Sequence, residues 1–210
     1  MTGSASRPQV VLASNNAKKL VELQRIVAPL VPGLTVLGLS DVASYPEPAE
    51  TDPTFAGNAL IKARACVEAT GLPALADDSG LCVDALNGMP GVLSARWSGV
   101  TGADKDRANN DLLLSQLGDV PDVRRTARFV CAVALCLPDG TEVVEHGEMA
   151  GRILHAPFGG GGFGYDPLFA ATGHDVSTAE LEVGEKDRIS HRGHALAAIA
   201  PRIAAALERS

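Results

Sequence analysis

The sequence predicts an α/β protein, because runs that suit buried strands alternate with segments of helical periodicity. In residues 17–30, Leu20, Leu23 and Val27 recur at steps of three or four, which places them on one face of a helix. A short apolar run at 9–13 precedes this segment and another follows it at 34–39. Two strands joined through one helix are the unit from which α/β sheets are built.

The other expected elements follow in chain order. They are a loop at 40–53, a helix at 54–70, a buried strand from 73 that ends at Asp77 and Asp78, a separate strand at 81–86, and a polar helix to about 117 with a capping box at Thr101 and Asp104. After these come strands at 125–137 and 141–154 around a Pro-Asp-Gly turn, and a last helix at 191–207. The long hairpin predicts an antiparallel part beside the first half.

Length and composition limit the class of protein. The 210 residues fit one domain of two lobes, here taken as 1–210 with a loose tail at 1–8, or two small domains. Only 4% of the residues are aromatic, and the formal net charge is −7. This balance argues against a nucleic-acid binder, which needs a basic face. It still allows a small polyanion to be held by a few local cations and a metal.

Cysteines and apolar runs indicate the compartment. Cys66, Cys82, Cys131 and Cys136 lie in apolar runs, form no C-x-x-C pair and have no histidine at zinc-ligand spacing. We expect buried, reduced thiols. The N-terminus has no apolar signal core, and no run reaches the length of a membrane span. The sequence therefore predicts a soluble, cytoplasmic protein with no membrane partner.

The stretch 73–99 carries the strongest chemical signal. Asp77, Asp78 and Ser79 stand together, and adjacent carboxylates repel unless a cation or a proton lies between them. We expect Mg²⁺ and a triphosphate there. Because side chains alternate along an extended chain, the two carboxylates should point to opposite faces. Asp77, Asp78 and Glu50 are the candidate metal ligands, and the alternation argues against a symmetric pair of ligands at 77 and 78.

Two helices begin with positive charge. Lys18 and Lys19 follow the expected N-cap Asn16, and His191 and Arg192 open the last helix. Cations there oppose the helix dipole, and a bound anion would remove the conflict. Solvated surface side chains are the alternative. Lys62 shares a helix face with Asn58 and precedes the acidic strand, so it is either a surface lysine or part of the site.

The glycine run 159–164 formally fits G-x-G-x-x-G, but Tyr165, Asp166 and Pro167 follow it where a dinucleotide site needs a helix. We therefore reject the dinucleotide interpretation. A binding loop and a flexible structural loop remain open. The chain also lacks a P-loop and a G-x-S-x-G motif.

Six blocks of the sequence resemble the inosine triphosphate pyrophosphatase family. They are residues 14–19, 55–64, 76–80, 94–99, 161–167 and 190–193. The resemblance spans nearly the whole chain. It implies an ITPase-like (Maf/Ham1-like) two-lobed α/β fold, with a central mixed, largely elongated β-sheet flanked by helices. It also implies Mg²⁺-dependent hydrolysis of ITP, dITP and XTP to the monophosphate and pyrophosphate, by a homodimer in the cytoplasm.

The resemblance also assigns roles residue by residue. Asp78 would accept a proton and bind Mg²⁺, with Glu50 as a less secure second ligand. The remaining matches would bind substrate; they are Ser14, Asn15, Asn16, Ala17, Lys18, Lys19, Lys62, Ser79, Phe163, Gly164, Tyr165, Asp166, Lys186, His191 and Arg192. Phe163 would stack on the purine. The family often has glycine where this chain has Asn15, and Trp97 is expected to pack rather than to stack on a base.

Two alternatives remain at this point. A Maf-like hydrolase of similar architecture would prefer pyrimidine or modified nucleotides. A non-catalytic nucleotide sensor would use the glycine run and the cations without chemistry. Base preference separates the first from a purine enzyme, and turnover separates the second.

Overall fold

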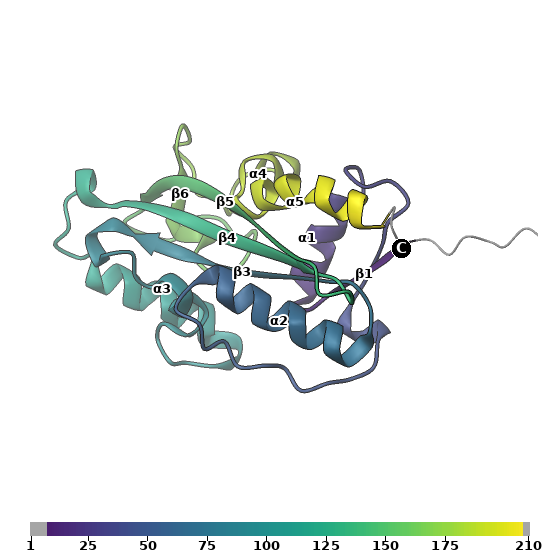
Figure 1. Cartoon of the computed structure of the whole chain (residues 1–210). Coiled ribbons are helices and arrows are strands. Elements are labelled where there is room, and N and C mark those ends of the chain that lie inside the picture. The colour runs from purple at the N-terminus through teal and green to yellow at the C-terminus, as the bar shows by residue number, and fades with distance from the viewer. Residues whose placement is uncertain (1–7, 208–210) are drawn as a thin grey trace, which may run out of the picture. The chain divides into compact units, whose positions relative to one another are not determined.

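A six-stranded mixed sheet runs through the computed structural model, which describes residues 8–207 (Figure 1). The strand order is β2-β1-β3-β4-β5-β6. Strand β1 pairs in parallel with β2 and with β3, whereas β5 and β6 are antiparallel. The strands are β1 (Gln9–Leu12), β2 (Thr35–Leu37), β3 (Ala74–Val83), β4 (Thr126–Cys136), β5 (Glu142–Ile153) and β6 (Phe169–Ala171). The predicted α/β class with a mixed sheet and flanking helices is confirmed.

The chain divides into two compact units. Unit 1 takes in the chain up to Asp78, then Ala132–His146 and the chain from Gly193, and unit 2 holds Ser79–Cys131 and Gly147–Arg192. Strands β3, β4 and β5 each contribute residues to both units. The division in β3 falls between Asp78 and Ser79, inside the motif that the sequence singled out.

The core of unit 1 around helix α2 consists mainly of small side chains. Helix α2 (Phe55–Thr70) packs Ala59, Ala63 and Cys66 into a core with β1, β3 and β4. Residues of this size let the helix axis approach the sheet closely. Thr54 caps the helix by accepting from the Gly57 amide, and Gly71 ends it in the left-handed region. Helix α1 (Ala17–Val27) also belongs to this unit.

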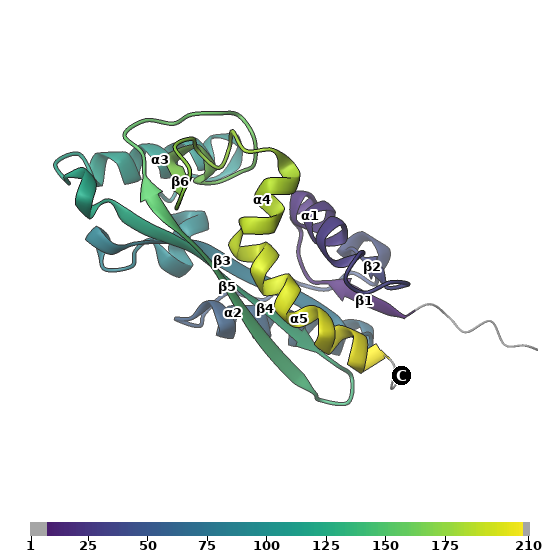
Figure 2. The same ribbon diagram turned by 90° about the horizontal axis from the view of Figure 1, so that it is seen from above.

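Most of helix α5 (His191–Leu207) completes unit 1. It buries Leu196, Ile199 and Ile203, as the sequence predicts. Within unit 1, α5 and α2 lie on opposite sides of the strands, as the two views in Figures 1 and 2 show. The strands of this unit are therefore covered on both faces.

The core of unit 2 contains aromatic side chains. Phe129 of β4 meets Phe169 of β6 edge to face, with the ring centroids 4.7 Å apart. Helix α3 (Lys105–Gln116) adds Leu113 to this core, and helix α4 (Val183–Ile189) adds Ile189 at its edge. The Arg125 guanidinium is buried and donates to the carbonyls of Leu117, Ile153 and Leu154.

Several local expectations were wrong. The strand expected to end at Asp77 and Asp78 continues as β3 to Val83, because both carboxylates have partners and the residues around them are buried. The segment 84–86 is a short 3-10 turn instead of strand. Thr101 makes no side-chain cap, and α3 begins only at Lys105, after a 3-10 turn.

Other features were not predicted or lie outside the structure. Helix α4 and strand β6 were not predicted, since each is too short for a clear period. Most of the expected tail at 1–8 lies outside the described residues. The four cysteines are free and buried, as expected. Within residues 8–207, no helix is both long and apolar enough to cross a membrane.

Candidate active site

Asp77 and Asp78 are buried neighbours in β3 with different partners. Asp77 forms an ion pair with Lys19, with 2.9 Å between Asp77 Oδ2 and Lys19 Nζ. Asp78 accepts a hydrogen bond from the Asn58 amide at 3.1 Å and lies 3.7 Å from the Lys62 ammonium. Both carboxylates keep less than a tenth of their exposure. Alternation along the strand therefore separates their roles, because Asp77 contacts α1 and Asp78 contacts α2.

Lys62 brings a second carboxylate to Asp78. Its ammonium lies 2.8 Å from Oε1 of Glu50 and 3.7 Å from Oδ1 of Asp78. One cation thus draws together an acid from the loop before α2 and an acid from β3. The predicted pair of metal ligands, Glu50 and Asp78, converges on this positive charge.

The pKa shifts follow from burial and from this charge arrangement. Burial raises the pKa of Asp78 above its usual value, and the Lys62 charge opposes that shift. Burial would lower the pKa of Lys62, but attraction from Asp78, Asp77 and Glu50 outweighs it and the pKa is raised. Lys62 is therefore charged at neutral pH.

Asn58 is a site residue that the sequence did not assign. Its amide nitrogen donates to Asp78, and its oxygen accepts from the Asp52 backbone amide at 2.9 Å. One fully buried side chain therefore orients the strand carboxylate and also holds the loop that carries Glu50. The spacing of Asn58 and Lys62, four residues apart on α2, was the available signal.

The start of α1 is held by its own side chains. Asn16 caps the helix as predicted and accepts from the amides of Lys18 and Lys19. Its own amide donates to the hydroxyl of Ser14. Ala17 is the first helical residue. The positive charge of Lys19 at the helix N-terminus is compensated within unit 1 by the Asp77 carboxylate.

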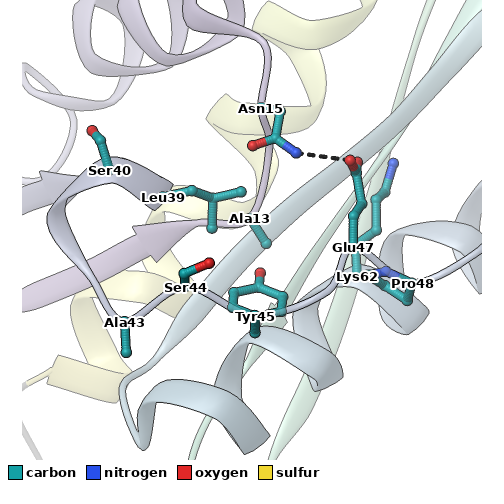
Figure 3. A pocket seen from close by; sticks show the side chains of 10 residues that line it. All are labelled: Ala13, Asn15, Leu39, Ser40, Ala43, Ser44, Tyr45, Glu47, Pro48 and Lys62. Atoms are coloured by element: carbon teal, nitrogen blue, oxygen red, sulfur yellow. Dashed lines mark hydrogen bonds between the residues drawn. The ribbon is translucent and has the colours of Figure 1, made fainter.

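A cavity of about 330 Å³ adjoins this loop in unit 1 (Figure 3). Asn15 donates to Oε2 of Glu47 at 2.7 Å, and Tyr45 and Lys62 also line the space. Asn15 is exposed, so its side chain is tolerated at this place in the loop.

Asp166 organises the second group of predicted residues, all of them in unit 2. Its Oδ2 accepts from the amide of Phe163 at 2.8 Å and from the ammonium of Lys186 at 2.6 Å. Its Oδ1 accepts from the hydroxyl of Thr178. A carboxylate with three donors fixes its neighbours, so Asp166 orders the backbone at Phe163 and the position of Lys186.

Arg192 and Phe163 come together in unit 2. The guanidinium carbon of Arg192 lies 5.6 Å from the centroid of the Phe163 ring, and Nη2 donates to Ser79 Oγ at 3.1 Å. His191 stacks on Phe129, with centroids 4.9 Å apart. Phe163 is half-buried, so one part of its ring remains open to a ligand. Arg192 thereby links the aromatic ring to the residue after Asp78.

Tyr165 and Trp97 have structural contacts. The buried Tyr165 hydroxyl donates to the carbonyl of Ser94 at 3.0 Å. Burial, together with the charge of Asp106, raises the Tyr165 pKa, so the phenol stays protonated. Trp97 donates to the side chain of Gln116 at 3.0 Å, which agrees with packing instead of base stacking.

The predicted site residues thus form two clusters. The carboxylate cluster of unit 1 consists of Glu50, Asp77 and Asp78 with Lys19 and Lys62, and the aromatic cluster of unit 2 consists of Phe163, Asp166, Lys186 and Arg192 with Ser79. The peptide bond between Asp78 and Ser79 joins them. Buried carboxylates and lysines of this kind suit an enzyme of phosphate chemistry.

The donor set fits a divalent cation completed by a substrate. The described part of the chain contains no group of three or more His, Cys, Asp or Glu side chains that would hold a metal alone. Glu50 and Asp78 supply two carboxylates around one positive charge. Mg²⁺ sites commonly use one or two carboxylates together with substrate phosphates.

Comparison with known proteins agrees with this class. The model of the Ham1 family matches residues 10–202. A dITP/XTP pyrophosphatase of Nocardia farcinica is 58% identical over 203 residues, which cover 96% of this chain and 98% of the relative. The chain belongs to the Ham1 family.

Solved structures show the same similarity. The crystal structure of a nucleoside-triphosphatase (dITP/XTP pyrophosphatase) from Mycobacterium abscessus is 54% identical, with a TM-score of 0.75 over 92% of this chain and 99% of that chain. The Ham1 protein of Staphylococcus aureus is 37% identical, with a TM-score of 0.82 over 94% and 99%. The family resemblance seen in the six sequence blocks is therefore confirmed.

Proposed function

We propose that this chain hydrolyses ITP, dITP and XTP to the nucleoside monophosphate and pyrophosphate, and so removes them from the nucleotide pool. The observation that carries the proposal is the convergence of Glu50 and Asp78 on the Lys62 cation, one peptide bond from Ser79 and its Arg192 contact. Relatives at 52–58% identity that carry the name dITP/XTP pyrophosphatase support the choice of substrates.

Residues of unit 1 would act on the triphosphate. Water cleaves the anhydride bond between the α and β phosphates, and its proton passes to Asp78, whose raised pKa suits a proton acceptor. Lys62, Lys19 and the loop from Ser14 would bind the phosphates. Mg²⁺ held by Glu50 and Asp78 would neutralise phosphate charge.

Residues of unit 2 would bind the nucleoside. Phe163 offers a partly open ring for stacking, and the Arg192 guanidinium and the Lys186 ammonium are donors beside it. Hypoxanthine and xanthine carry a 6-keto acceptor, whereas adenine carries a 6-amino donor. An unpaired buried group costs about 1–3 kcal/mol, so these donors disfavour ATP by roughly 5- to 150-fold.

The assembly and compartment form a separate part of the proposal. We propose a homodimer in the cytoplasm, where the four buried thiols would remain reduced. Light scattering coupled to size exclusion should give about twice the 21.7 kDa of the chain. A monomeric mass at micromolar concentration contradicts the dimer.

A nucleotide panel tests the activity. Purified protein is incubated with ITP, dITP, XTP, GTP, ATP and dTTP, with Mg²⁺ or EDTA, and pyrophosphate is measured separately from phosphate. We expect pyrophosphate from the first three, only with Mg²⁺, and a slower release of pyrophosphate from ATP than from ITP. Phosphate without pyrophosphate, equal rates on ATP and ITP, or preference for dTTP would each contradict the proposal.

The Asp78→Asn variant tests the catalytic assignment. It keeps the shape of the side chain and the hydrogen-bonding potential toward Asn58, but it cannot accept the proton. We expect kcat for ITP to fall at least about 100-fold, with an unchanged circular dichroism spectrum. Asp77→Asn is the matched comparison and should retain more activity, since Asp77 pairs with Lys19. The reverse ranking would move the catalytic role to Asp77.

A further inference from the structure

We infer that Asp106, together with Asn110, is a positioning residue of the base site: it fixes the peptide groups of Gly164 and thereby the orientation of Phe163. The inference rests on the proposed function, because it takes Phe163 as the ring that meets the base. Both residues lie on α3, and neither belongs to the six blocks that resemble the family.

Gly164 is bound from both sides by one helix. Its amide donates to Oδ2 of Asp106 at 2.9 Å, and its carbonyl accepts from the side-chain amide of Asn110 at 3.1 Å. Asp106 and Asn110 are four residues apart, one helical turn, and so share a face of α3. Both polar groups of a single residue are therefore held by one rigid element.

The glycine run offers few side chains of its own to pack against α3. A cavity of about 270 Å³ lies beside the glycine run, lined by Asp106, Asn110, Phe163 and residues 160–162. Residues 160–162 are glycines, so they bring no side chains to fill it. Two hydrogen bonds to Gly164 therefore hold the loop to α3 beside this cavity.

Asn110 has a feature that a packing role does not explain. The residue keeps 9% of its exposure, and its Oδ1 is buried without a hydrogen-bond partner among the described residues. A buried acceptor without a partner is unfavourable. The Asn110 side chain is therefore held with a desolvated oxygen, which is unfavourable, while its nitrogen donates to the Gly164 carbonyl.

The pair Asp106 and Asn110, called the clamp below, complements the hydrogen bond by which Asp166 anchors Phe163. Asp166 holds the amide of Phe163, and α3 holds the next residue, Gly164. Gly164 has φ of +63°, and a glycine opposes rotation about its backbone less than any other residue. With both anchors, the backbone on each side of the Phe163 ring is fixed. Without Asp106, Gly164 loses one of its two holds on α3.

The same helix face holds a second segment of unit 2. Asn109 accepts from the amide of Ser98 at 2.8 Å and donates to the carbonyl of Ser94 at 3.3 Å. Tyr165, which follows Gly164, donates to the same carbonyl of Ser94. Polar side chains of α3 therefore bind two backbone segments of unit 2, one at residues 94–98 and one at Gly164.

Kinetics of three variants test the clamp. Asp106→Ala removes the acceptor for Gly164, and we expect KM for ITP to rise about tenfold with kcat within twofold. Asp106→Asn keeps an acceptor oxygen and should restore KM to within about twofold. Asp111→Ala is the control, because it removes an exposed carboxylate that lines the same cavity. It should behave as the wild type.

Amide hydrogen exchange supplies a readout apart from activity. In Asp106→Ala, the amides of Phe163 and Gly164 should exchange faster, while those of β4 keep their protection. Asn110→Ala is a second variant with the same expected direction, should Asp106→Ala fail to fold. Unchanged KM and unchanged exchange in both folded variants would overturn the inference, as would Asp106→Asn behaving like Asp106→Ala.

Phe163→Ala separates failure of the clamp from failure of the proposed function. A wild type that releases no pyrophosphate from ITP sinks the function itself. A normal KM in Phe163→Ala removes the base role on which the clamp rests. A raised KM in Phe163→Ala with an unchanged KM in Asp106→Ala overturns the clamp alone.

Discussion

Lys62 supplies the positive charge that neutralises the carboxylates of Glu50 and Asp78. Its ammonium lies between Glu50 and Asp78, and the pKa of Asp78 is already raised by burial. Removing one partner from a buried ionic group leaves uncompensated charge, which costs more than the pair contributes when intact. The stability of unit 1 should therefore depend on a cation at this position.

The Lys62→Met variant makes this dependence measurable. Without divalent metal we expect a loss of about 2–3 kcal/mol, below the range for fully buried pairs because the Glu50 side chain keeps 28% of its exposure. Added Mg²⁺ should raise the Tm of the variant more than that of the wild type, since the metal takes over the charge. Calorimetry across a MgCl₂ titration measures both effects.

Lys18→Met is the control for charge alone, because Lys18 is an exposed lysine of unit 1. It should change Tm little and respond to Mg²⁺ as the wild type does. An Mg²⁺ response in Lys62→Met no larger than in the control would show that the carboxylates do not share a cation site.

Residue chemistry could be predicted where neighbours in sequence are also neighbours in space. Alternation along an extended strand gave Asp77 and Asp78 different faces, and the structure pairs them with Lys19 and Lys62. The Asp106 contact with Gly164 spans 58 residues, and no local pattern encodes such a pair. Long-range backbone anchors of this kind need the fold.

At the element scale, the segments with strong periodicity were predicted and the weaker signals failed. Helices α1, α2 and α5 show the apolar period of a helix, and their predicted bounds agree with the structure to within a few residues. The predicted strand was shorter than β3, because the two aspartates were interpreted as the end of a strand. Burial and ion pairing overrode that local signal, as tertiary contacts commonly do.

The glycine run yields a prediction about one element. A Cβ at Gly162 would collide with the Asp166 carboxylate and lie 2.6 Å from Lys186 Nζ, and its φ is +71°. Gly160, in the same run, has open space around its Cβ position. We expect Gly162→Ala to raise KM for ITP at least tenfold, and Gly160→Ala to change it less than twofold. Steady-state kinetics of the two variants checks this.

The comparison also separates geometry from flexibility. If the run acts only as a flexible linker, both alanine substitutions should have similar, small effects. If Asp166 is the anchor that the hydrogen bonds indicate, the effect should follow Gly162 alone. A Gly162→Ala enzyme with normal KM would contradict the anchor.

At the scale of the whole molecule, the chain shares its strands between the units. Strands β3, β4 and β5 pass from one unit to the other without a break, each with residues of both. Unfolding of one unit would remove hydrogen-bonded neighbours from part of each shared strand, and this should destabilise the rest of that strand in the other unit. We therefore predict one cooperative unfolding transition for the described chain.

Two probes can follow the units separately in urea. Trp97 is the only tryptophan of the sequence and reports unit 2 by fluorescence, while pulsed alkylation of the buried Cys66 reports unit 1. The two midpoints should coincide. Leu23→Ala in α1, where the side chain keeps 2% of its exposure, should cost about 2–5 kcal/mol. Because the strands are shared, this unit 1 substitution should shift the Trp97 transition by the same amount as the Cys66 transition. A Trp97 midpoint that stays at the wild-type value would show that each unit unfolds alone.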